Sequence, residues 1–533
     1  VDCSYQDLDE IPDVIPDDKF RLESLYMSDN KISVISPGSF DNLFELEDLD
    51  LSGNLMTSFS NDLFVAMNSS LRVLNLGRNQ ITNTSTPMFS IPMKMLVELH
   101  LHDNLISVLN DGVFQGLSSL KVLNLKFNVL KELNNTGATL IGLENLEQLF
   151  LENGKLSKLS RSAFNGLNDL KELDLTSNAL EIGYAEWAQV FYMCRLAILL
   201  SYLVSHITPP ICPVVFIQMV ILSELDLNTN KIQHLKEEWF ESLRNLESLR
   251  LDSNWITSWD TKVFYSLRNL KFLDLSKNAI NSLDTEMFTG LVSLERLLLN
   301  ENSITVIPTG VFDTIPSIQV LYIPHNRIEN LPPNCLQNLS HLTTFDLEDG
   351  QISSVGETAF AGLPNLRTLR MAGNKIQEIS LSAFQSPRHI SLVATLDLND
   401  NQLTEVPVSA LQNMTHLSAL YLSKNPITSL QITDNAFSAL GGLIDLRISE
   451  CTIDSISPYA FEGVTQLEIL DVSNNKLTTP SHEWYSSFQA DKLTSVSLYG
   501  NPWLCNCSVY PYQQWLLDGA GGLQPYTLTT VCD

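Results

Sequence analysis

Two histidines, His100 and His102, stand two residues apart in the sequence LHLHDN and are followed by Asp103. Alternate residues of a β-strand point to the same face, so both imidazoles would lie on one side of a strand. Such a pair can share a metal ion, or it can act as a pH-sensitive contact because imidazole titrates near ~6.5. A solvated polar pair is the more common arrangement, and we predict no metal site and no cofactor.

The sequence contains none of the common catalytic signatures of hydrolases, metalloproteases and nucleotide-binding enzymes. It has no H-E-x-x-H, no G-x-S-x-G and no G-x-x-x-x-G-K-[ST]. His482, in the sequence HEW, is expected to lie in a surface turn. We therefore do not expect an enzyme.

Acidic residues dominate the charge of the chain. Its 533 residues include 61 Asp and Glu against 32 Lys and Arg, which gives a formal net charge of −29. The acidic residues are spread along the chain, as on a solvated surface, and do not form an acidic tail. A negative surface repels phosphate backbones, so nucleic acid is not an expected partner.

A repeated pattern of leucines must position any functional residue. The template L-x-x-L-x-L-x-x-N-x-L appears as LESLYMSDNKI from Leu22, as LVELHLHDNLI from Leu96 and finally as LTSVSLYGNPW from Leu493. Nineteen copies occur, mostly 24 or 25 residues apart. A fixed period of this length predicts a solenoid, in which each coil buries its leucines against its neighbours.

Each part of the template has a physical role. The L-x-L segment predicts a short strand with its leucines inward and the intervening residues outward. The Asn side chain can satisfy backbone groups that the following turn leaves without strand partners. Cys451 can do this in part, whereas Gly154 and Gly350 cannot, so we predict weak points at these two coils. A second row, on the convex side, consists of Phe40, Phe64, Phe114, Phe164, Phe240, Phe264, Phe288, Phe312, Phe360, Phe384, Phe437 and Phe461.

The template resembles the leucine-rich repeat family in its 24-residue extracellular form, over nearly the whole chain. This resemblance implies an α/β solenoid, a horseshoe with one curved parallel β-sheet on its concave face and about 19–20 coils. The first residues, CSYQDLDEIPDVIP, and the later NPWLCNCSVYPYQQWL resemble the cysteine caps of such proteins. By that resemblance Cys505 pairs with Cys532, and Cys3 and Cys507 lack partners in this chain; a metal half-site at C-x-C is the disfavoured alternative.

The repeat and its two ends divide the chain into five expected parts. They are a truncated N-terminal cap (1–21), repeats (22–182), an irregular hydrophobic segment (183–221), repeats (222–501) and a truncated C-terminal cap (502–533).

The irregular segment is open to three interpretations. Asn178 and Asn230 are 52 residues apart, which leaves room for one more coil. Phe216-x-x-Met219-x-x-Leu222 matches the convex row of the next coil, and this favours a degenerate coil with a poor strand near Leu199. A loop insertion or non-native sequence is the second interpretation. A membrane span is disfavoured, because the two apolar runs are far shorter than the ~20 residues required.

The compartment follows from the caps and from glycosylation motifs. Cysteine caps imply an oxidising environment, so we expect an extracellular protein with no membrane span in this chain. Its beginning has no signal-peptide pattern. Sequons for N-linked glycans occur at Asn68, Asn83, Asn134, Asn338, Asn413 and Asn506.

The outward strand positions predict a ligand-binding concave face. An apolar patch with an aromatic pair and one arginine has the composition of a protein interface. The candidate residues are Phe272, Arg296, Leu298, Val320 and Tyr322, with a second group of His100, His102 and Phe150. Charged residues elsewhere on this face favour a polar partner.

Resemblance to Toll-like receptor ectodomains and to leucine-rich variable lymphocyte receptors implies a recognition module of the innate-immune type. Such a module would bind a protein or a microbial product on its concave face, and the resemblance allows dimerisation. The alternative is a cell-adhesion, guidance or matrix protein of the Slit or neuronal type.

Overall fold

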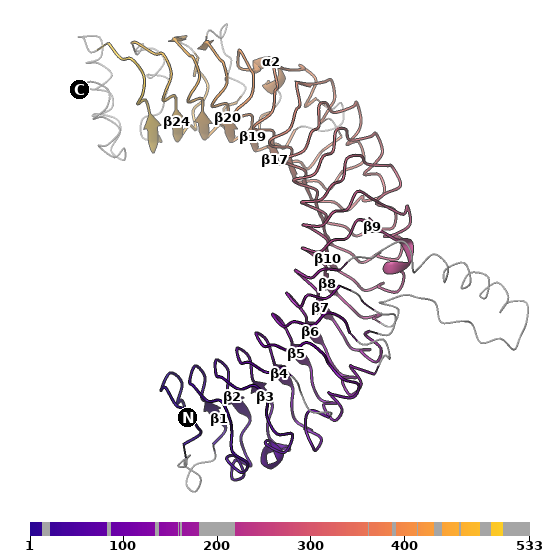
Figure 1. The fold of residues 1–533 in the computed structure, drawn as a ribbon. Helices are drawn as coiled ribbons and strands as arrows, with labels where there is room; N and C mark the ends of the chain where they lie inside the picture. Colours follow the sequence, from indigo (N-terminus) through magenta and orange to yellow (C-terminus); the bar gives the residue numbers. More distant parts are fainter. Residues whose placement is uncertain are drawn as a thin grey trace, which may run out of the picture. The chain divides into compact units, whose positions relative to one another are not determined.

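The computed structural model describes residues 1–12, 22–82, 87–133, 138–157, 159, 163–180, 219–360, 362–385, 391–412, 414–430, 437, 440–457, 460–479 and 492–504. The chain divides into two compact units, Val1–Asp274 and Leu275–Asp533. Each unit is a stack of coils with parallel strands along its inner, concave edge (Figure 1).

The main sheet of the first unit contains one strand from each described coil. Its strands are β1 (Ser24–Tyr26), β2 (Asp48–Asp50), β3 (Val73–Asn75), β4 (Glu98–His100), β5 (Val122–Asn124), β6 (Gln148–Phe150), β7 (Glu172–Asp174), β8 (Glu224–Asp226), β10 (Ser248–Arg250) and β12 (Phe272–Asp274). A separate pair, β9 (His234–Leu235) and β11 (Ser258–Trp259), is also parallel. Residues at the start of the chain extend the main sheet, since Cys3 N donates to Tyr26 O at 2.7 Å.

The second unit repeats this plan. Its main strands are β13 (Arg296–Leu298), β14 (Val320–Tyr322), β15 (Thr344–Asp346), β17 (Thr368–Arg370), β19 (Thr395–Asp397), β20 (Ala419–Tyr421), β22 (Asp445–Arg447), β24 (Ile469–Asp471) and β25 (Ser495–Ser497). Two short parallel pairs are β16 (Ser354–Val355) with β18 (Glu378–Ile379), and β21 (Ser429–Leu430) with β23 (Ser455–Ile456). The predicted parallel solenoid is confirmed.

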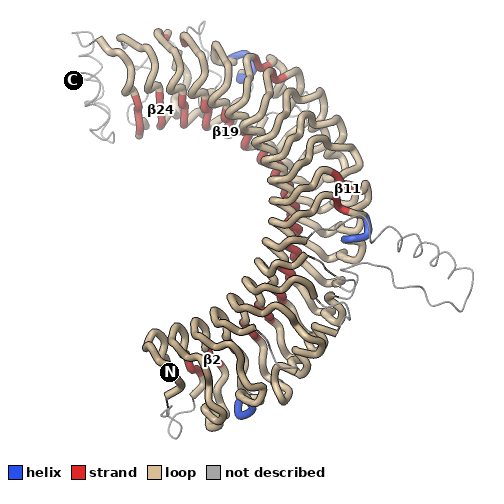
Figure 2. Tube along the Cα trace, viewed as in Figure 1, coloured by secondary structure: helices blue, strands red, loops and turns tan. Residues whose placement is uncertain are grey.

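The described residues contain little helix. They include the 3₁₀ turns η1 (Val65–Met67) and η2 (Glu237–Trp239) and the short helix α2 (Val408–Leu411). Turns and loops make up the rest of each coil away from the strands (Figure 2). A coil of about 24 residues that also holds a strand and two bends leaves too few residues for a long helix.

The core has two rows of apolar side chains, as predicted. Strand-centre leucines such as Leu49 and Leu74 face each other in register across neighbouring strands and are fully buried. All twelve phenylalanines of the predicted convex row are buried as well. Neighbouring rings stack; for example, the centroids of Phe240 and Phe264 lie 6.3 Å apart at 7°.

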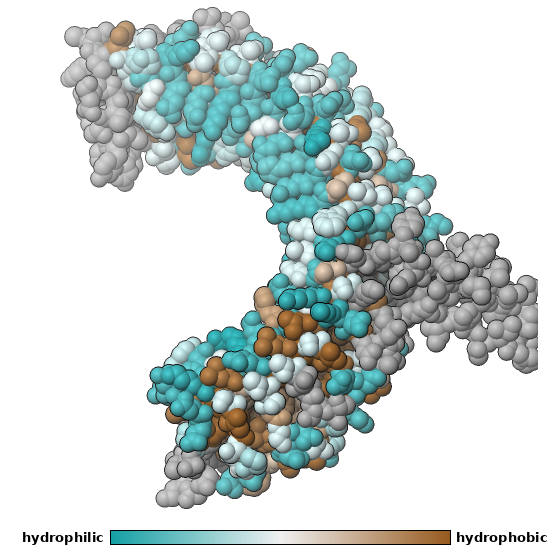
Figure 3. All heavy atoms as spheres, in the orientation of Figure 1, coloured by the Kyte–Doolittle hydropathy of each residue, from teal (hydrophilic) through white to brown (hydrophobic). Residues whose placement is uncertain are grey.

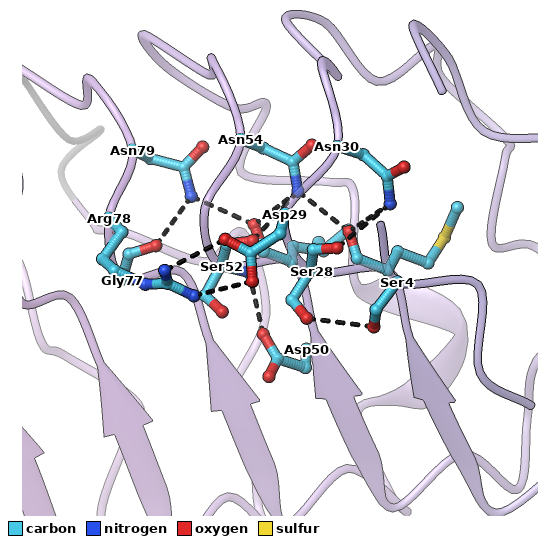
Figure 4. Close-up of polar contacts among 12 residues, drawn as sticks. Ser4, Ser28, Asp29, Asn30, Asp50, Ser52, Asn54, Gly77, Arg78 and Asn79 are labelled. Carbon is cyan, nitrogen blue, oxygen red and sulfur yellow. Dashed lines mark hydrogen bonds and ion pairs between the residues drawn. The ribbon is translucent and has the colours of Figure 1, made fainter. Parts of the chain in front are cut away.

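The asparagines form the predicted ladder between coils (Figure 4). Asn54 Nδ2 donates to Met27 O at 2.9 Å, in the preceding coil, and to Leu51 O at 3.0 Å. Its Oδ1 accepts from Ile32 N at 3.0 Å. Side chains of this row therefore join each coil to the one before it.

The three exceptional ladder positions differ in how they are compensated. Cys451 Sγ lies 3.5 Å from both Leu422 O and Ser449 O, so the thiol replaces part of the amide as predicted. At Gly154, the next asparagine helps, because Asn178 Oδ1 accepts from Gly154 N at 3.0 Å. That Gly154 and Gly350 are weak points remains a prediction about stability.

One regular feature of the turns was not predicted. The residue before each ladder position adopts a positive φ, for example 55° at Asp29, 52° at Arg78 and 66° at Gly53. Gly53 also leaves room for its neighbour, because a Cβ there would collide with Asp29 Oδ1. Arg78 reaches across this glycine and places both terminal nitrogens 3.0 Å from the Asp29 carboxylate (Figure 4).

The irregular segment does not supply a strand to the sheet. Strands β7 and β8 pair directly, with Leu173 opposite Leu225, so the predicted extra strand near Leu199 is wrong. Leu180 N also donates to Asn230 Oδ1 at 3.1 Å across the junction. Most of the segment lies outside the described residues, but its end belongs to the regular coil, because Met219 and the following Leu222 of the next part are buried as the match indicated.

A loop replacement tests this insertion directly. Exchanging residues 181–218 for a copy of residues 233–242 restores the 24-residue spacing between the flanking asparagines. Because β7 and β8 already pair, we expect the melting temperature to stay within about 2 °C of the parent or to rise, since a shorter loop costs less closure entropy. A variant that fails to fold, or melts more than about 5 °C lower, would show that the segment supports the solenoid.

Candidate ligand-binding face

The strand face of each unit is formed by side chains that flank the buried leucines. On most strands the middle residue is buried and the two outer residues are half-buried or exposed, as at Gln148, Leu149 and Phe150. Because side chains alternate along a strand, a residue two positions after it can also lie on this face, as Lys126 does against Phe150. This geometry holds the outward side chains at intervals set by the strand spacing of ~4.8 Å.

The two predicted histidines do lie together, on β4 and just after it. Their ring centroids are 6.3 Å apart in an edge-to-face arrangement, and His100 Nε2 is 3.2 Å from Glu98 Oε2. The His102 ring lies over Gly77, where a Cβ would collide with it. Burial, and then the neighbouring His100, lower the pKa of His102, which favours the neutral imidazole.

In the part of the chain that the structure describes, no further ligand group joins the histidine pair to form a metal site. There, no three His, Cys, Asp or Glu side chains are arranged so that they could hold a metal ion.

Phe150, the third predicted residue of this group, carries a cation on its ring. Lys126 Nζ lies 4.9 Å from the ring centroid. The same ammonium is 2.9 Å from Glu152 Oε2 and 2.9 Å from Asp174 Oδ2. Burial alone would lower the pKa of Lys126, but the two carboxylates outweigh it and raise the pKa.

Acidic residues cover the next part of the first unit's strand face. Glu172 stands opposite Glu224, and Asp174 stands opposite Asp226, on the paired strands β7 and β8. Burial, and then the neighbouring carboxylates Glu224 and Asp174, raise the pKa values of Glu172 and Asp226 respectively. Like charges directly opposite each other destabilise a sheet, so this region favours a cationic neighbour.

Exposed apolar side chains are concentrated in the first unit (Figure 3). Among them, Phe127 is 46% exposed and lies at the edge of the strand face, where its N–H donates to Glu152 O at 2.7 Å. Its position beside the coil of Phe150 extends the apolar part of this face.

The structure brings together four of the five residues predicted for the other patch. In the second unit, Arg296 stands opposite Val320, and Leu298 stands opposite Tyr322, on β13 and β14. Val320, Leu298 and Tyr322 are half-buried and Arg296 is exposed. Phe272 belongs to the first unit, where the guanidinium carbon of Arg250 lies 5.6 Å from its ring centroid.

A carboxylate cluster lies next to Tyr322 in the second unit. The Asp346 side chain is fully buried, and its Oδ1 accepts from Glu348 N at 3.0 Å. Arg370 Nη1 lies 3.5 Å from Asp346 Oδ2. Burial, followed by Asp346 and Asp397, raises the pKa of Glu348 to about 7.

Sequence reasoning missed Lys126 and Glu348 as members of this face. Both follow their strand by two residues, a position that the template treats as part of the turn. The signal was present, because the predicted His102 occupies the same position in its own coil.

The modification sites are described only in part. Asn338 is exposed and donates to Asp313 Oδ1 at 2.8 Å, whereas Asn68 is half-buried at the end of η1. Cys3 forms no disulfide within the described residues. The remaining predicted residues, Asn83, Asn134, Asn413, Asn506, Cys505, Cys507 and Cys532, lie outside the described part of the chain.

Among the residues that the structure describes, no helix is both long enough and apolar enough to cross a bilayer.

Constant buried leucines and variable outward residues on parallel coils define a solenoid repeat protein. The family model described as "Leucine rich repeat" matches residues 20–81, 94–153, 210–256, 244–304, 293–352, 340–393, 391–443 and 430–477. The chain therefore belongs to the leucine-rich repeat family.

Several curated proteins are similar to parts of the chain. Mouse chondroadherin is 34% identical over 84 residues, which is 16% of this chain and 22% of that protein. Bovine lumican is 33% identical over 147 residues (27% and 40%), and chicken keratocan is 34% identical over 128 residues (24% and 34%). The chain thus matches less than half the length of each of these relatives.

Two solved structures share the fold over most of the chain. A leucine-rich repeat protein of Leptospira interrogans has a TM-score of 0.54 and 23% identity, covering 90% of this chain and 96% of its own. TLR13, solved in complex with the RNA ssRNA13, has a TM-score of 0.53 and 20% identity, covering 99% of this chain and 93% of its own.

Proposed function

We propose that this protein is a non-catalytic extracellular recognition module that binds its ligand on the concave strand face. One observation carries this proposal: the strand centres are buried and almost always leucine, while the flanking residues differ from coil to coil. Packing of the solenoid explains the constant residues. It does not require a cation held on Phe150 or a half-buried tyrosine beside carboxylates, and these fit a surface that contacts a partner.

The charge of the strand face favours a protein, or a microbial product with cationic groups, over nucleic acid. Paired carboxylates on β7 and β8 repel phosphates. TLR13 was solved with RNA, but at 20% identity the likeness indicates a shared fold and does not indicate a shared ligand. A phosphate-binding face would need a surplus of Lys and Arg that β7 and β8 do not provide.

The innate-immune type of receptor ectodomain, or secreted recognition protein, is our first choice. Its support is the match in fold to TLR13 over 99% of this chain. The alternative, an adhesion, guidance or matrix protein, has its own support in the identity of 33–34% to chondroadherin, lumican and keratocan over short segments. Cysteine caps and sequons support an extracellular location in both cases.

The test is a binding screen of the intact secreted chain against microbial products and host proteins, followed by variants of the strand face. With the ligand found, we expect Tyr322→Ala or Phe272→Ala to weaken binding by about tenfold, as loss of an aromatic interface residue does. Tyr265→Ala is the control, because Tyr265 is 50% exposed and does not belong to a main strand. Unchanged affinity in both strand-face variants would remove these two residues from the site.

A further inference from the structure

The second unit contains a group of carboxylates that is poorly neutralised. Asp346 is fully buried, yet its Oδ2 accepts no hydrogen bond and has Arg370 Nη1 only at 3.5 Å. Its Oδ1 accepts from the backbone N–H of Glu348, so the two acidic residues are linked at 3.0 Å. Strand register places Asp397 on the far side of Arg370 from Asp346. The charge of Arg370 is therefore shared between the two aspartates.

The charged and titratable groups around Glu348 and Asp346 come from four neighbouring coils. Its own coil contributes Asp346 and Asp349, and the preceding coil contributes Tyr322 and His325. The following coils contribute Arg370 and Asp397. His325 is already engaged, since its Nδ1 lies 3.2 Å from Asp349 Oδ2. One arginine thus faces Asp346, Glu348 and Asp397 together.

We propose that this cluster is a pH-dependent element of the strand face. It holds the coils of β15 and β17 together when Glu348 is protonated, and it weakens the contact between them when Glu348 ionises. Repulsion between ionised Glu348 and the buried Asp346 acts within the turn that follows β15, and the backbone of this turn hydrogen-bonds to the next coil. In that turn Leu347 N donates to Arg370 O, and Asp349 N donates to Ala372 O, both at 2.8 Å.

The direction of the pH dependence follows from the raised pKa of Glu348. In the unfolded chain this carboxyl titrates near 4.5, and in the folded unit it titrates at about 7. Below pH 4.5 both states are protonated and the cluster carries no penalty from Glu348. The contribution of Glu348 to stability is lost as the pH rises from 4.5 through about 7, and above that range this contribution no longer changes.

Hydrogen exchange of the full chain tests this without any ligand. After correction for intrinsic exchange rates, we expect the protection of the Leu347 and Asp349 amides to fall at least about fivefold between pH 5.5 and 8. Glu348→Gln keeps the shape and removes the charge, so its protection should stay constant over this range. Glu357→Gln, at an exposed position of the same unit, should keep the wild-type dependence.

Histidine titration is excluded with His325→Gln, which should also keep the wild-type dependence. The proposal is overturned if Glu348→Gln loses protection with pH as the wild type does, or if His325→Gln abolishes the effect. The readout uses no ligand, so its failure would leave the proposed recognition function untouched.

Discussion

Replacing Asn54 with alanine is expected to destabilise the first unit by about 3 kcal/mol, from the loss of several buried hydrogen bonds. The amide donates to Met27 O and Leu51 O, accepts from Ile32 N, and is only 3% exposed. Alanine leaves these backbone groups buried without a partner, and each unsatisfied group costs about 1–3 kcal/mol. Urea denaturation gives the loss of stability, and hydrogen exchange should show faster exchange at Ile32 N.

Two further variants make this prediction specific. Asn54→Asp keeps the acceptor but replaces the donor with a buried charge, so it should destabilise at least as much as alanine. Asn245→Ala removes a single exposed bond, from Nδ2 to Val220 O at 2.8 Å, and should cost less than about 1 kcal/mol. Equal effects at Asn54 and Asn245 would contradict the ladder as the link between coils.

Phe264→Ala is expected to destabilise the first unit by about 4 kcal/mol, in the range for a large aromatic side chain removed from a core. Phe264 is fully buried, stacks on Phe240 and meets Trp259 edge-on, with ring centroids 5.7 Å apart. Alanine leaves a cavity in the convex row, between Phe240 of the preceding coil and Trp259 of the same coil. Chemical denaturation, monitored by circular dichroism, measures the effect.

The adjacent Tyr265 provides the control for this variant. Its side chain is half exposed, so Tyr265→Ala should cost less than about 1 kcal/mol although it removes a ring of similar size. Phe264→Leu should lie between the two, because leucine fills part of the space. Losses of similar size at Phe264 and Tyr265 would show that the convex row is not a packed core.

The repeat predicted most of the fold because its residues act locally. The leucines of L-x-L and the phenylalanine that follows can be buried only between stacked coils. The repeat period therefore predicts both the solenoid and which side chains form its core. The positive φ of Asp29 and Arg78 was missed, although Gly53 occupies the same position and marks it. An ordinary side chain at this position hides the conformation that a glycine makes visible.

The irregular segment misled sequence reasoning for a physical reason. Met219 near its end and Leu222 just after it do belong to the convex side of a coil, and this real match suggested one coil more. Only the pairing of β7 with β8 shows that the sheet continues without it. Apolar content alone does not distinguish a coil from an insertion between coils.

The sequence predicted which residues lie on the candidate face, but it did not predict which charged groups surround them. His100, Phe150 and Tyr322 were expected on the strand face and lie there. The ammonium of Lys126 lies on Phe150, one coil further along the chain. The pKa of Glu348 is raised by burial first, and then by Asp346 in its own coil and Asp397 two coils away. Such neighbours follow only from the register between coils.

Footprinting of the ligand complex tests the central claim, that ligand binds the concave strand face, most directly. Hydroxyl-radical labelling of the free and ligand-bound chain reports the exposure of individual side chains. The account predicts reduced labelling at strand-face residues such as Phe150, Phe272 and Tyr322. Labelling should stay unchanged at Tyr265 and Phe44, which are 50% and 61% exposed and belong to no main strand. Protection at Tyr265 or Phe44, with none on the strand face, would contradict it.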